Sequence, residues 1–144
     1  NIYVDPEAAH LVFQLDVDLV VAPLDVTHKA LTSPEWSATL RAKNHPVCDV
    51  VAGWTEFFER FDTEKYGSGG APLRDPCVIA YLIAPELFSG RRINVEIETQ
   101  SELTRGMTVA DWWGVTDRPA NALFLGNIDA GKYFELITQR LAQL

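Results

Sequence analysis

Cysteine, methionine and long apolar runs are scarce in this 144-residue chain. Cys48 and Cys77 are the only two cysteines and do not form a CxxC pair, so we expect two buried thiols rather than a disulfide. No apolar run approaches the roughly 20 residues that a membrane-spanning helix requires. A membrane span is therefore not expected, and the reducing cytoplasm is the expected location.

Basic residues are also few, with 12 Lys and Arg against 20 Asp and Glu, which gives a formal net charge of −8. Nucleic acids and anionic membranes are not expected as partners, because both bind clustered Lys and Arg. Small neutral ligands, cations and other proteins stay open. Hydrophobic residues make up 47% of the chain, which is enough for a packed core and argues against disorder.

Several catalytic and metal-binding patterns are missing as well. No serine or cysteine lies in a nucleophile-elbow pattern, and the glycine-rich residues 66–72 do not lead into the Lys-Ser/Thr of a phosphate loop. Asp16 and Asp18 form a pair that is common at strand entries, and we do not expect it to bind metal. Structural or surface roles are expected for the three histidines, which show no metal-ligand spacing: His10, His28 and His45.

The first residue is Asn1 rather than methionine, and a helix-start signal, Asp5-Pro6, follows after only four residues. We interpret the chain as a fragment or a processed chain. Since neither an internal repeat nor a linker is present, residues 1–144 are expected to be one piece of one domain.

Helix-start signals and apolar periodicity predict most of the helices. Asp5-Pro6, Ser33-Pro34 and Asp75-Pro76 each place a capping side chain before a proline, Asp129 caps a final helix, and another helix is expected near Thr27. The strongest periodic element is a helix with one apolar face, which is expected to pack in the core; stacking of one of its aromatic rings on a ligand is the alternative. Its residues fall at three- and four-residue steps: Val47, Val50, Val51, Trp54, Phe57, Phe58 and Phe61.

Three segments are predicted to be strands: residues 18–22 as a buried parallel strand, 92–98 with one wet face, and 122–125. Residues 66–72 are predicted to be a loop whose glycines are free to take positive φ, and 105–119 an irregular crossing. The mixed order indicates an α/β sheet with helices packed around it. Three or so strands are few for such a sheet, which agrees with part of the sheet lying elsewhere.

A resemblance covers essentially the whole chain. The matching segments, in order, are residues 1–9 (NIYVDPEAA), 23–27 (PLDVT), 66–77 (YGSGGAPLRDPC), 96–100 (EIETQ), 103–109 (LTRGMTV) and 111–112 (DW). Together they resemble the inosine-uridine-preferring nucleoside hydrolase family. The resemblance implies a mixed, mainly parallel α/β sheet flanked by helices, with residues 1–144 as the carboxy-terminal part of a single domain.

The resemblance also implies an activity, the cleavage of the N-glycosidic bond of ribonucleosides to ribose and free base. In the family, several aspartates bind a calcium ion, which holds the ribose hydroxyls and the attacking water. Most of them belong to an Asp-x-Asp-x-Gly-x-Asp-Asp motif that this sequence does not contain. Because calcium takes six to eight oxygen ligands, this chain alone is expected to be inactive, whereas its parent protein would be a hydrolase.

Three residues carry over from the resemblance. Asp75 falls at the family's last calcium ligand, with an N-cap before Pro76 as the alternative role. Asn1 falls at an amide that bonds a ribose hydroxyl. Arg74 replaces the family's histidine beside the leaving base; a guanidinium keeps its proton at neutral pH, which excludes general-acid catalysis, yet Arg74 could stabilise charge on the base. Alternatively, Arg74 points to solvent or pairs with a carboxylate.

Two rival interpretations stay open. One is a non-catalytic protein that keeps the scaffold and binds ribosides or partners, which the arginine at position 74 favours. The other is a stable fragment without a function of its own. An exposed sheet edge and apolar helix faces would then pair with another copy, so a homo-oligomer is expected.

Overall fold

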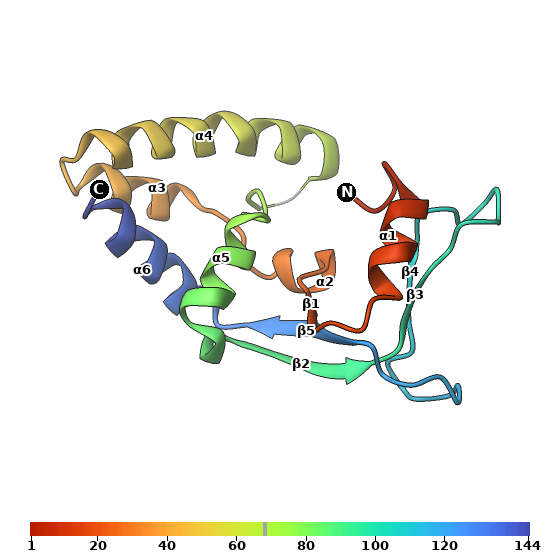
Figure 1. Ribbon diagram of the computed structural model, residues 1–144. Helices are drawn as coiled ribbons and strands as arrows, with labels where there is room; N and C mark the ends of the chain where they lie inside the picture. Colours follow the sequence, from red (N-terminus) through yellow and green to blue (C-terminus); the bar gives the residue numbers. More distant parts are fainter. Residues whose placement is uncertain (68) are drawn as a thin grey trace. The chain divides into compact units, whose positions relative to one another are not determined.

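The computed structural model describes residues 1–67 and 69–144. The backbone forms two units, one made of residues 1–21 and 90–125 and the other of residues 22–89 and 126–144. Each unit is described by itself below (Figure 1). The prediction of a single domain over residues 1–144 stays a prediction.

The first unit contains α1 (Pro6–Phe13), β1 (Leu19–Val21), β3 (Val95–Ile97) and β4 (Thr108–Ala110), with the adjoining parts of β2 (Phe88–Ile93) and β5 (Ala122–Ile128). As predicted, α1 begins where Asp5 Oδ1 accepts a hydrogen bond from the Ala8 N–H at 2.9 Å. β3 and β4 pair antiparallel, so part of the predicted irregular crossing is a strand.

The core of this unit lies between α1 and the strands, and Figure 1 shows α1 alongside β3 and β4. The Asn121 side chain links three segments: its Nδ2 donates to the Phe13 carbonyl at 3.0 Å and to the Val95 carbonyl at 2.9 Å, and its Oδ1 accepts from the Val95 N–H at 2.8 Å. The buried core residues are Phe13, Ile93, Val95, Ile97, Ala122 and Phe124.

The main sheet has the strand order β1-β5-β2. β1 and β5 are parallel, with Leu19 opposite Ala122. β2 is antiparallel to β5, because Asn121 N–H donates to the Ile93 carbonyl at 3.1 Å and Asp129 N–H to the Leu87 carbonyl at 2.8 Å. The sheet is therefore mixed and the α/β prediction is confirmed, although β1 lies at the sheet edge and is not buried: Val20 is 42% exposed.

The second unit is helical. It contains α2 (Leu24–Thr27), α3 (Pro34–Arg41), α4 (Pro46–Tyr66), α5 (Pro76–Ile83), the 3-10 turn η1 (Pro85–Leu87) and α6 (Ala130–Leu141). Ser33 and Asp129 cap α3 and α6 as predicted, accepting from Trp36 N–H and Lys132 N–H. The helix expected to begin near Thr27 instead ends there. Of the predicted loop over residues 66–72, Tyr66 belongs to α4 and Ser68 lies outside the described residues.

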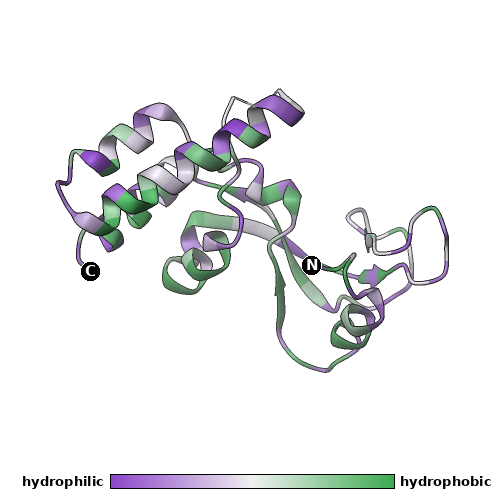
Figure 2. Cartoon of the chain, turned by 90° about the horizontal axis from the view of Figure 1, so that it is seen from above, coloured by the Kyte–Doolittle hydropathy of each residue, from purple (hydrophilic) through white to green (hydrophobic). Residues whose placement is uncertain are grey.

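α3, α4 and α6 enclose the core of this unit (Figure 1). The Trp36 indole lies 4.7 Å from the Phe134 ring centroid and donates from Nε1 to Thr138 Oγ1 at 2.9 Å. Cys48 and Cys77 are free thiols and buried, as the sequence predicts. The helices carry both hydrophobic and hydrophilic residues (Figure 2).

The aromatic face of α4 is not in the core, which corrects the sequence prediction. Trp54 is 70% exposed, Phe57 75%, Phe58 45% and Phe61 56%. The buried face instead carries Cys48 and Ala52, which are fully buried. The side of α4 that packs in the helical core is thus the one with small side chains, and the aromatic side lies on the surface.

Candidate active site

The loop before α5 is tied to the chain segment at Ala30–Thr32. Thr32 N–H donates to the Ala71 carbonyl at 2.9 Å, and Leu73 N–H donates to the Ala30 carbonyl at 3.1 Å. The Thr32 hydroxyl donates to the same Ala71 carbonyl at 3.0 Å and accepts from the Ala71 N–H at 3.2 Å. These bonds fix the backbone that leads into Arg74 and Asp75.

Gly70 allows this close approach. A Cβ atom at Gly70 would lie 2.0 Å from the Thr32 carbonyl oxygen, a distance that no side chain can tolerate. Of the described glycines in the predicted loop, only Gly67 has a positive φ, at 65°. Glycine is thus required at position 70 because a side chain would collide with Thr32, and not because the backbone there is left-handed.

Tyr133 and Cys77 hold the other side of the loop. The Tyr133 hydroxyl donates to the Leu73 carbonyl at 2.9 Å, and the Cys77 thiol donates to the same oxygen at 3.3 Å. Burial, and next the neighbouring Cys77, raises the pKa of the Tyr133 phenol. Burial likewise raises the pKa of the Cys77 thiol. Both groups are therefore protonated donors at neutral pH.

Asp75 precedes α5 but does not cap it. Its backbone is helical, with φ −62° and ψ −38°, and its side chain makes no capping hydrogen bond. Asp5, Ser33 and Asp129 differ, because each accepts a bond from the first turn of its helix. The Asp75 carboxylate is exposed and its oxygens are not occupied by the helix end, so the predicted N-cap role is not formed.

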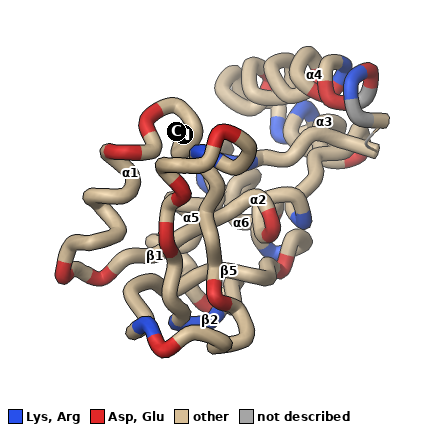
Figure 3. Tube along the Cα trace, turned by 90° about the vertical axis from the view of Figure 1, so that its right-hand side faces the viewer, with Lys and Arg blue, Asp and Glu red and all other residues tan. Residues whose placement is uncertain are grey.

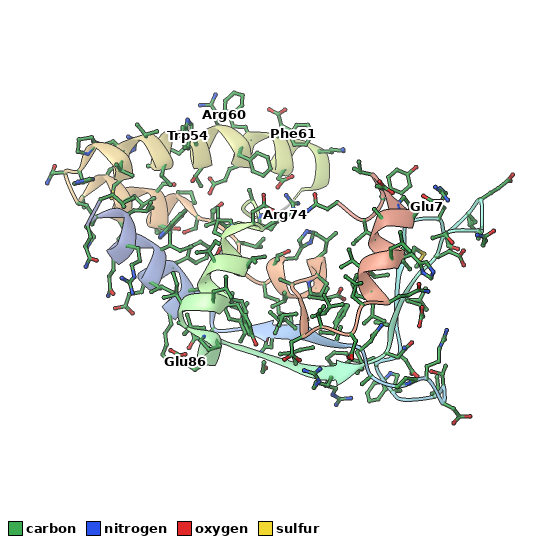
Figure 4. The ribbon with its side chains drawn as sticks, viewed as in Figure 1. Glu7, Trp54, Arg60, Phe61, Arg74 and Glu86 are labelled. Atoms are coloured by element: carbon green, nitrogen blue, oxygen red, sulfur yellow. The ribbon has the colours of Figure 1, made fainter. Side chains whose placement is uncertain are left out.

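Arg74 pairs with a buried carboxylate of α4. Its Nη2 lies 3.9 Å from Asp62 Oδ2; the Arg74 side chain is 34% exposed and that of Asp62 only 3%. Figure 4 shows Arg74 on the side of α4 that faces α5, whereas Arg60 points to the opposite side. The carboxylate pairing, one of the alternatives for Arg74, is present, and about a third of the Arg74 side chain stays exposed. Whether Arg74 also contacts a leaving group stays a prediction.

A pocket of about 460 Å³ opens beside Arg74 and Asp75. Trp54 and Phe58 of α4 line it together with Thr55, and the loop from Ala71 to Pro76 forms another part of its wall. An aromatic surface and a guanidinium thus border one space. Such a pocket suits a flat heterocycle that carries or develops negative charge.

The inner face of α4 changes from apolar to polar toward its carboxyl end. After Cys48 and Ala52 come Thr55, Glu59 and Asp62 at three- and four-residue steps. Glu59 Oε1 and Asp62 Oδ2 are shielded from solvent without a hydrogen-bond partner among the described side chains. Both signs of charge gather on this end of α4 (Figure 3). The sequence analysis did not identify Asp62. Helical spacing could have found it, because Asp62 continues the three- and four-residue steps that begin at Cys48 and Ala52.

Asn1 belongs to the first unit, whereas Arg74 and Asp75 are neighbours in the second. Asn1 is exposed, and its carbonyl oxygen accepts a hydrogen bond from the Val4 N–H at 3.0 Å. No hydrogen bond to its side-chain amide occurs among the described residues. Its predicted contact with a ribose stays a prediction.

The described residues alone do not fit a calcium ion. Among residues 1–67 and 69–144, no group of three or more His, Cys, Asp or Glu side chains is placed to hold a metal. Asp75 offers at most one carboxylate, whereas calcium takes six to eight oxygen ligands. Within the same residues, the helices are too short or too polar to cross a membrane.

The sequence profile of the family described as inosine-uridine preferring nucleoside hydrolase matches residues 1–135. The chain belongs to this family. An uncharacterised protein of Schizosaccharomyces pombe is 44% identical over 144 residues, which are 100% of this chain and 46% of that protein. The pyrimidine-specific ribonucleoside hydrolase RihA of Citrobacter koseri is 47% identical over 143 residues, covering 99% of this chain and 46% of RihA.

A solved structure shows the same fold. The purine-preferring ribonucleoside hydrolase from Gardnerella vaginalis superimposes with a TM-score of 0.85 at 25% identity, over 99% of this chain and 45% of that one. The α/β nucleoside hydrolase fold predicted from the sequence is thereby confirmed. The chain spans somewhat less than half the length of the relatives that it matches.

Proposed function

We propose that the protein carrying this chain is an N-ribohydrolase, which cleaves ribonucleosides to ribose and free base. The observation that carries the proposal is the pocket bordered by Trp54, Phe58, Arg74 and Asp75, in a chain that belongs to a nucleoside hydrolase family. The chain is proposed as the carboxy-terminal part of one such domain. Alone, it would be inactive, because the described residues supply too few metal ligands.

The reaction requires little covalent chemistry from these residues. The bond between ribose C1′ and the base nitrogen breaks, and its electron pair stays on the base. The water oxygen bonds to C1′ and releases one proton, while the base takes up a proton from solvent. Ribonucleoside and water thus give ribose and free base, with no net change in protons.

Arg74 is proposed to face the departing base. A guanidinium cannot donate its proton at neutral pH, but its N–H groups can stabilise the electron pair that collects on the base. Trp54 and Phe58 would stack on the ring. Replacing Arg74 by His would introduce a group that can protonate the base, so Arg74→His is expected to change the preference among bases.

Asp75 is proposed as one calcium ligand and Asn1 as a ribose contact, both on the strength of the family resemblance. Calcium, when bound, would polarise a water molecule and orient the ribose hydroxyls. The free, uncapped Asp75 carboxylate supports a ligand role. The remaining ligands and the general base are proposed to come from a part of the protein outside these 144 residues.

The test is ribose release by the intact protein from uridine, cytidine and inosine, with calcium and after addition of a chelator. We expect release with calcium and its loss with the chelator. Binding of the ribosides without release of ribose would support the alternative, a non-catalytic riboside-binding or interaction protein, which the arginine at position 74 favours. A cytoplasmic location, a homo-oligomeric state and a role in nucleoside salvage are further proposals of the same hypothesis.

A further inference from the structure

Asp62 is a buried carboxylate on α4. Its side chain is 3% exposed, and its Oδ2 atom has no hydrogen-bond donor among the described residues. A buried carboxylate needs a partner of opposite charge to stay ionised. Among the described residues, the ion pair recorded for Asp62 is the one with Arg74 Nη2 at 3.9 Å.

The pair leaves Arg74 free to act on a ligand. Arginine has five N–H donors in a planar fork, and one ion pair at 3.9 Å does not occupy them. The Arg74 side chain is 34% exposed, and Arg74 lines the pocket together with Asp75.

α4 supplies both the aromatic residues that line the pocket and the carboxylate that pairs with Arg74. Phe58 lines the pocket, and Asp62 follows it by four residues on the same helix, one turn closer to the carboxyl end. One helix therefore fixes the spacing between the Phe58 ring and the Asp62 carboxylate that pairs with Arg74. A donor held in place before the reaction stabilises developing charge better than one that must be ordered during it.

We propose that Asp62 is the positioning residue for Arg74, holding its guanidinium at the pocket where it stabilises the electron pair on the departing base. This inference rests on the proposed function and deepens it. Asp62 acts through Arg74 rather than on the substrate. The effect of replacing Asp62 on kcat should therefore depend on how much stabilisation the leaving group needs.

The test compares two substrates in the intact protein with calcium. Uridine has a leaving group that needs stabilisation, whereas 4-nitrophenyl riboside releases a phenolate that is already a stable anion. Asp62→Asn is expected to lower kcat for uridine about tenfold or more, below the ~10²–10³ typical for loss of a whole charge-stabilising donor. The kcat for 4-nitrophenyl riboside should change less than twofold, and Arg74→Gln should show the same split.

Three further variants make the result decisive. Asp49→Asn makes the same change at an exposed position of α4 and should leave both substrates unaffected. Asp62→Glu keeps the buried charge and moves the guanidinium, so the same substrate-selective loss is expected even if Asp62→Asn does not fold. The double variant Asp62→Asn with Arg74→Gln should be no slower than Arg74→Gln alone.

Equal losses for both substrates, or no loss for either, would overturn the positioning role while leaving the hydrolase proposal intact. If the unaltered protein turned over neither substrate with calcium, the proposed function would fail, and the inference with it.

Discussion

The Tyr133 hydroxyl lies 2.9 Å from the Leu73 carbonyl oxygen and donates a hydrogen bond to it. Leu73 immediately precedes Arg74 and Asp75, so a residue of α6 fixes the backbone at the candidate site. Tyr133 is fully buried and its ring packs on Phe134 at 5.1 Å between centroids. This hydrogen bond thus links the helical core to the candidate site.

Removing this hydroxyl is expected to destabilise the protein. Tyr133→Phe keeps the ring and deletes the donor, leaving the Leu73 carbonyl with only the weaker Cys77 thiol. We expect the free energy of unfolding to fall by about 1–2 kcal/mol, the usual effect of losing a buried hydrogen bond. Urea denaturation measures the change. Tyr81→Phe is the matched control, because the Tyr81 ring packs on Phe88 and no hydrogen bond joins its hydroxyl to the described residues of the loop; similar losses in both variants would contradict the anchoring role.

Alkaline pH should reduce the stability that the buried Tyr133 hydroxyl contributes. Burial raises the pKa of Tyr133 above its ordinary value of 10.0, so the folded protein holds this proton more tightly than the unfolded chain does. The contribution is fully present below pH 10.0 and is lost as the pH rises further, because the unfolded chain then gains stability by ionising. Above that pH, the free energy of unfolding should therefore fall less steeply with rising pH in Tyr133→Phe than in the unaltered protein. Identical slopes for both proteins would refute this assignment.

A methyl group at Gly70 should disrupt the loop. Its Cβ would lie 2.0 Å from the Thr32 carbonyl oxygen, which itself belongs to rigid backbone. We expect Gly70→Ala to cost about 1–3 kcal/mol or more, as for overpacked sites. Gly69→Ala is the control, since nothing lies within 4 Å of a Cβ there. Comparable melting temperatures for the two variants would show that the loop can move away.

Local sequence signals predicted the helix starts well. Asp5, Ser33 and Asp129 cap their helices as expected, because a cap involves only the next three residues of the chain. Asp75 shares the same Asp-Pro signal as Asp5 and yet makes no cap, since tertiary contacts fix the backbone around it. The same Asp-Pro pattern thus precedes a capped helix at Asp5 and an uncapped helix at Asp75.

The site itself could be predicted only in part. Arg74 and Asp75 were found through the family resemblance, whereas their environment depends on contacts between distant segments. The pairing of Arg74 with Asp62 spans a loop, and periodicity alone did not show which side of α4 faces the core. The packing of Cys48 and Ala52 against the neighbouring helices decided that side, and it brought Asp62 inward.

Asp75 should affect cation binding without affecting the fold. Asp75→Asn removes the negative charge, and no cap is lost because none is formed. We expect the intact protein to bind calcium more weakly by titration calorimetry, with an unchanged melting temperature in the absence of the cation. Ser33→Ala provides the opposite pattern: it removes a cap and should cost about 1 kcal/mol while leaving calcium affinity intact. Unaltered calcium affinity in Asp75→Asn would exclude this carboxylate as a ligand.

Two exposed aromatic residues of α4, Trp54 and Phe57, should differ in function although their exposed fractions are similar. Trp54 is 70% exposed and lines the pocket, whereas Phe57 is 75% exposed and is not among the residues that line it. Stacking of an aromatic pair contributes about 0.5–1.5 kcal/mol beyond its buried area, so Trp54→Ala should raise KM for a riboside roughly 2–10-fold. Phe57→Ala should leave KM unchanged, and neither variant should lose much stability, because little apolar surface is buried by either ring. A KM shift of the same size in both variants would place the base elsewhere, since of these two residues Trp54 lines the pocket beside Arg74 and Phe57 does not.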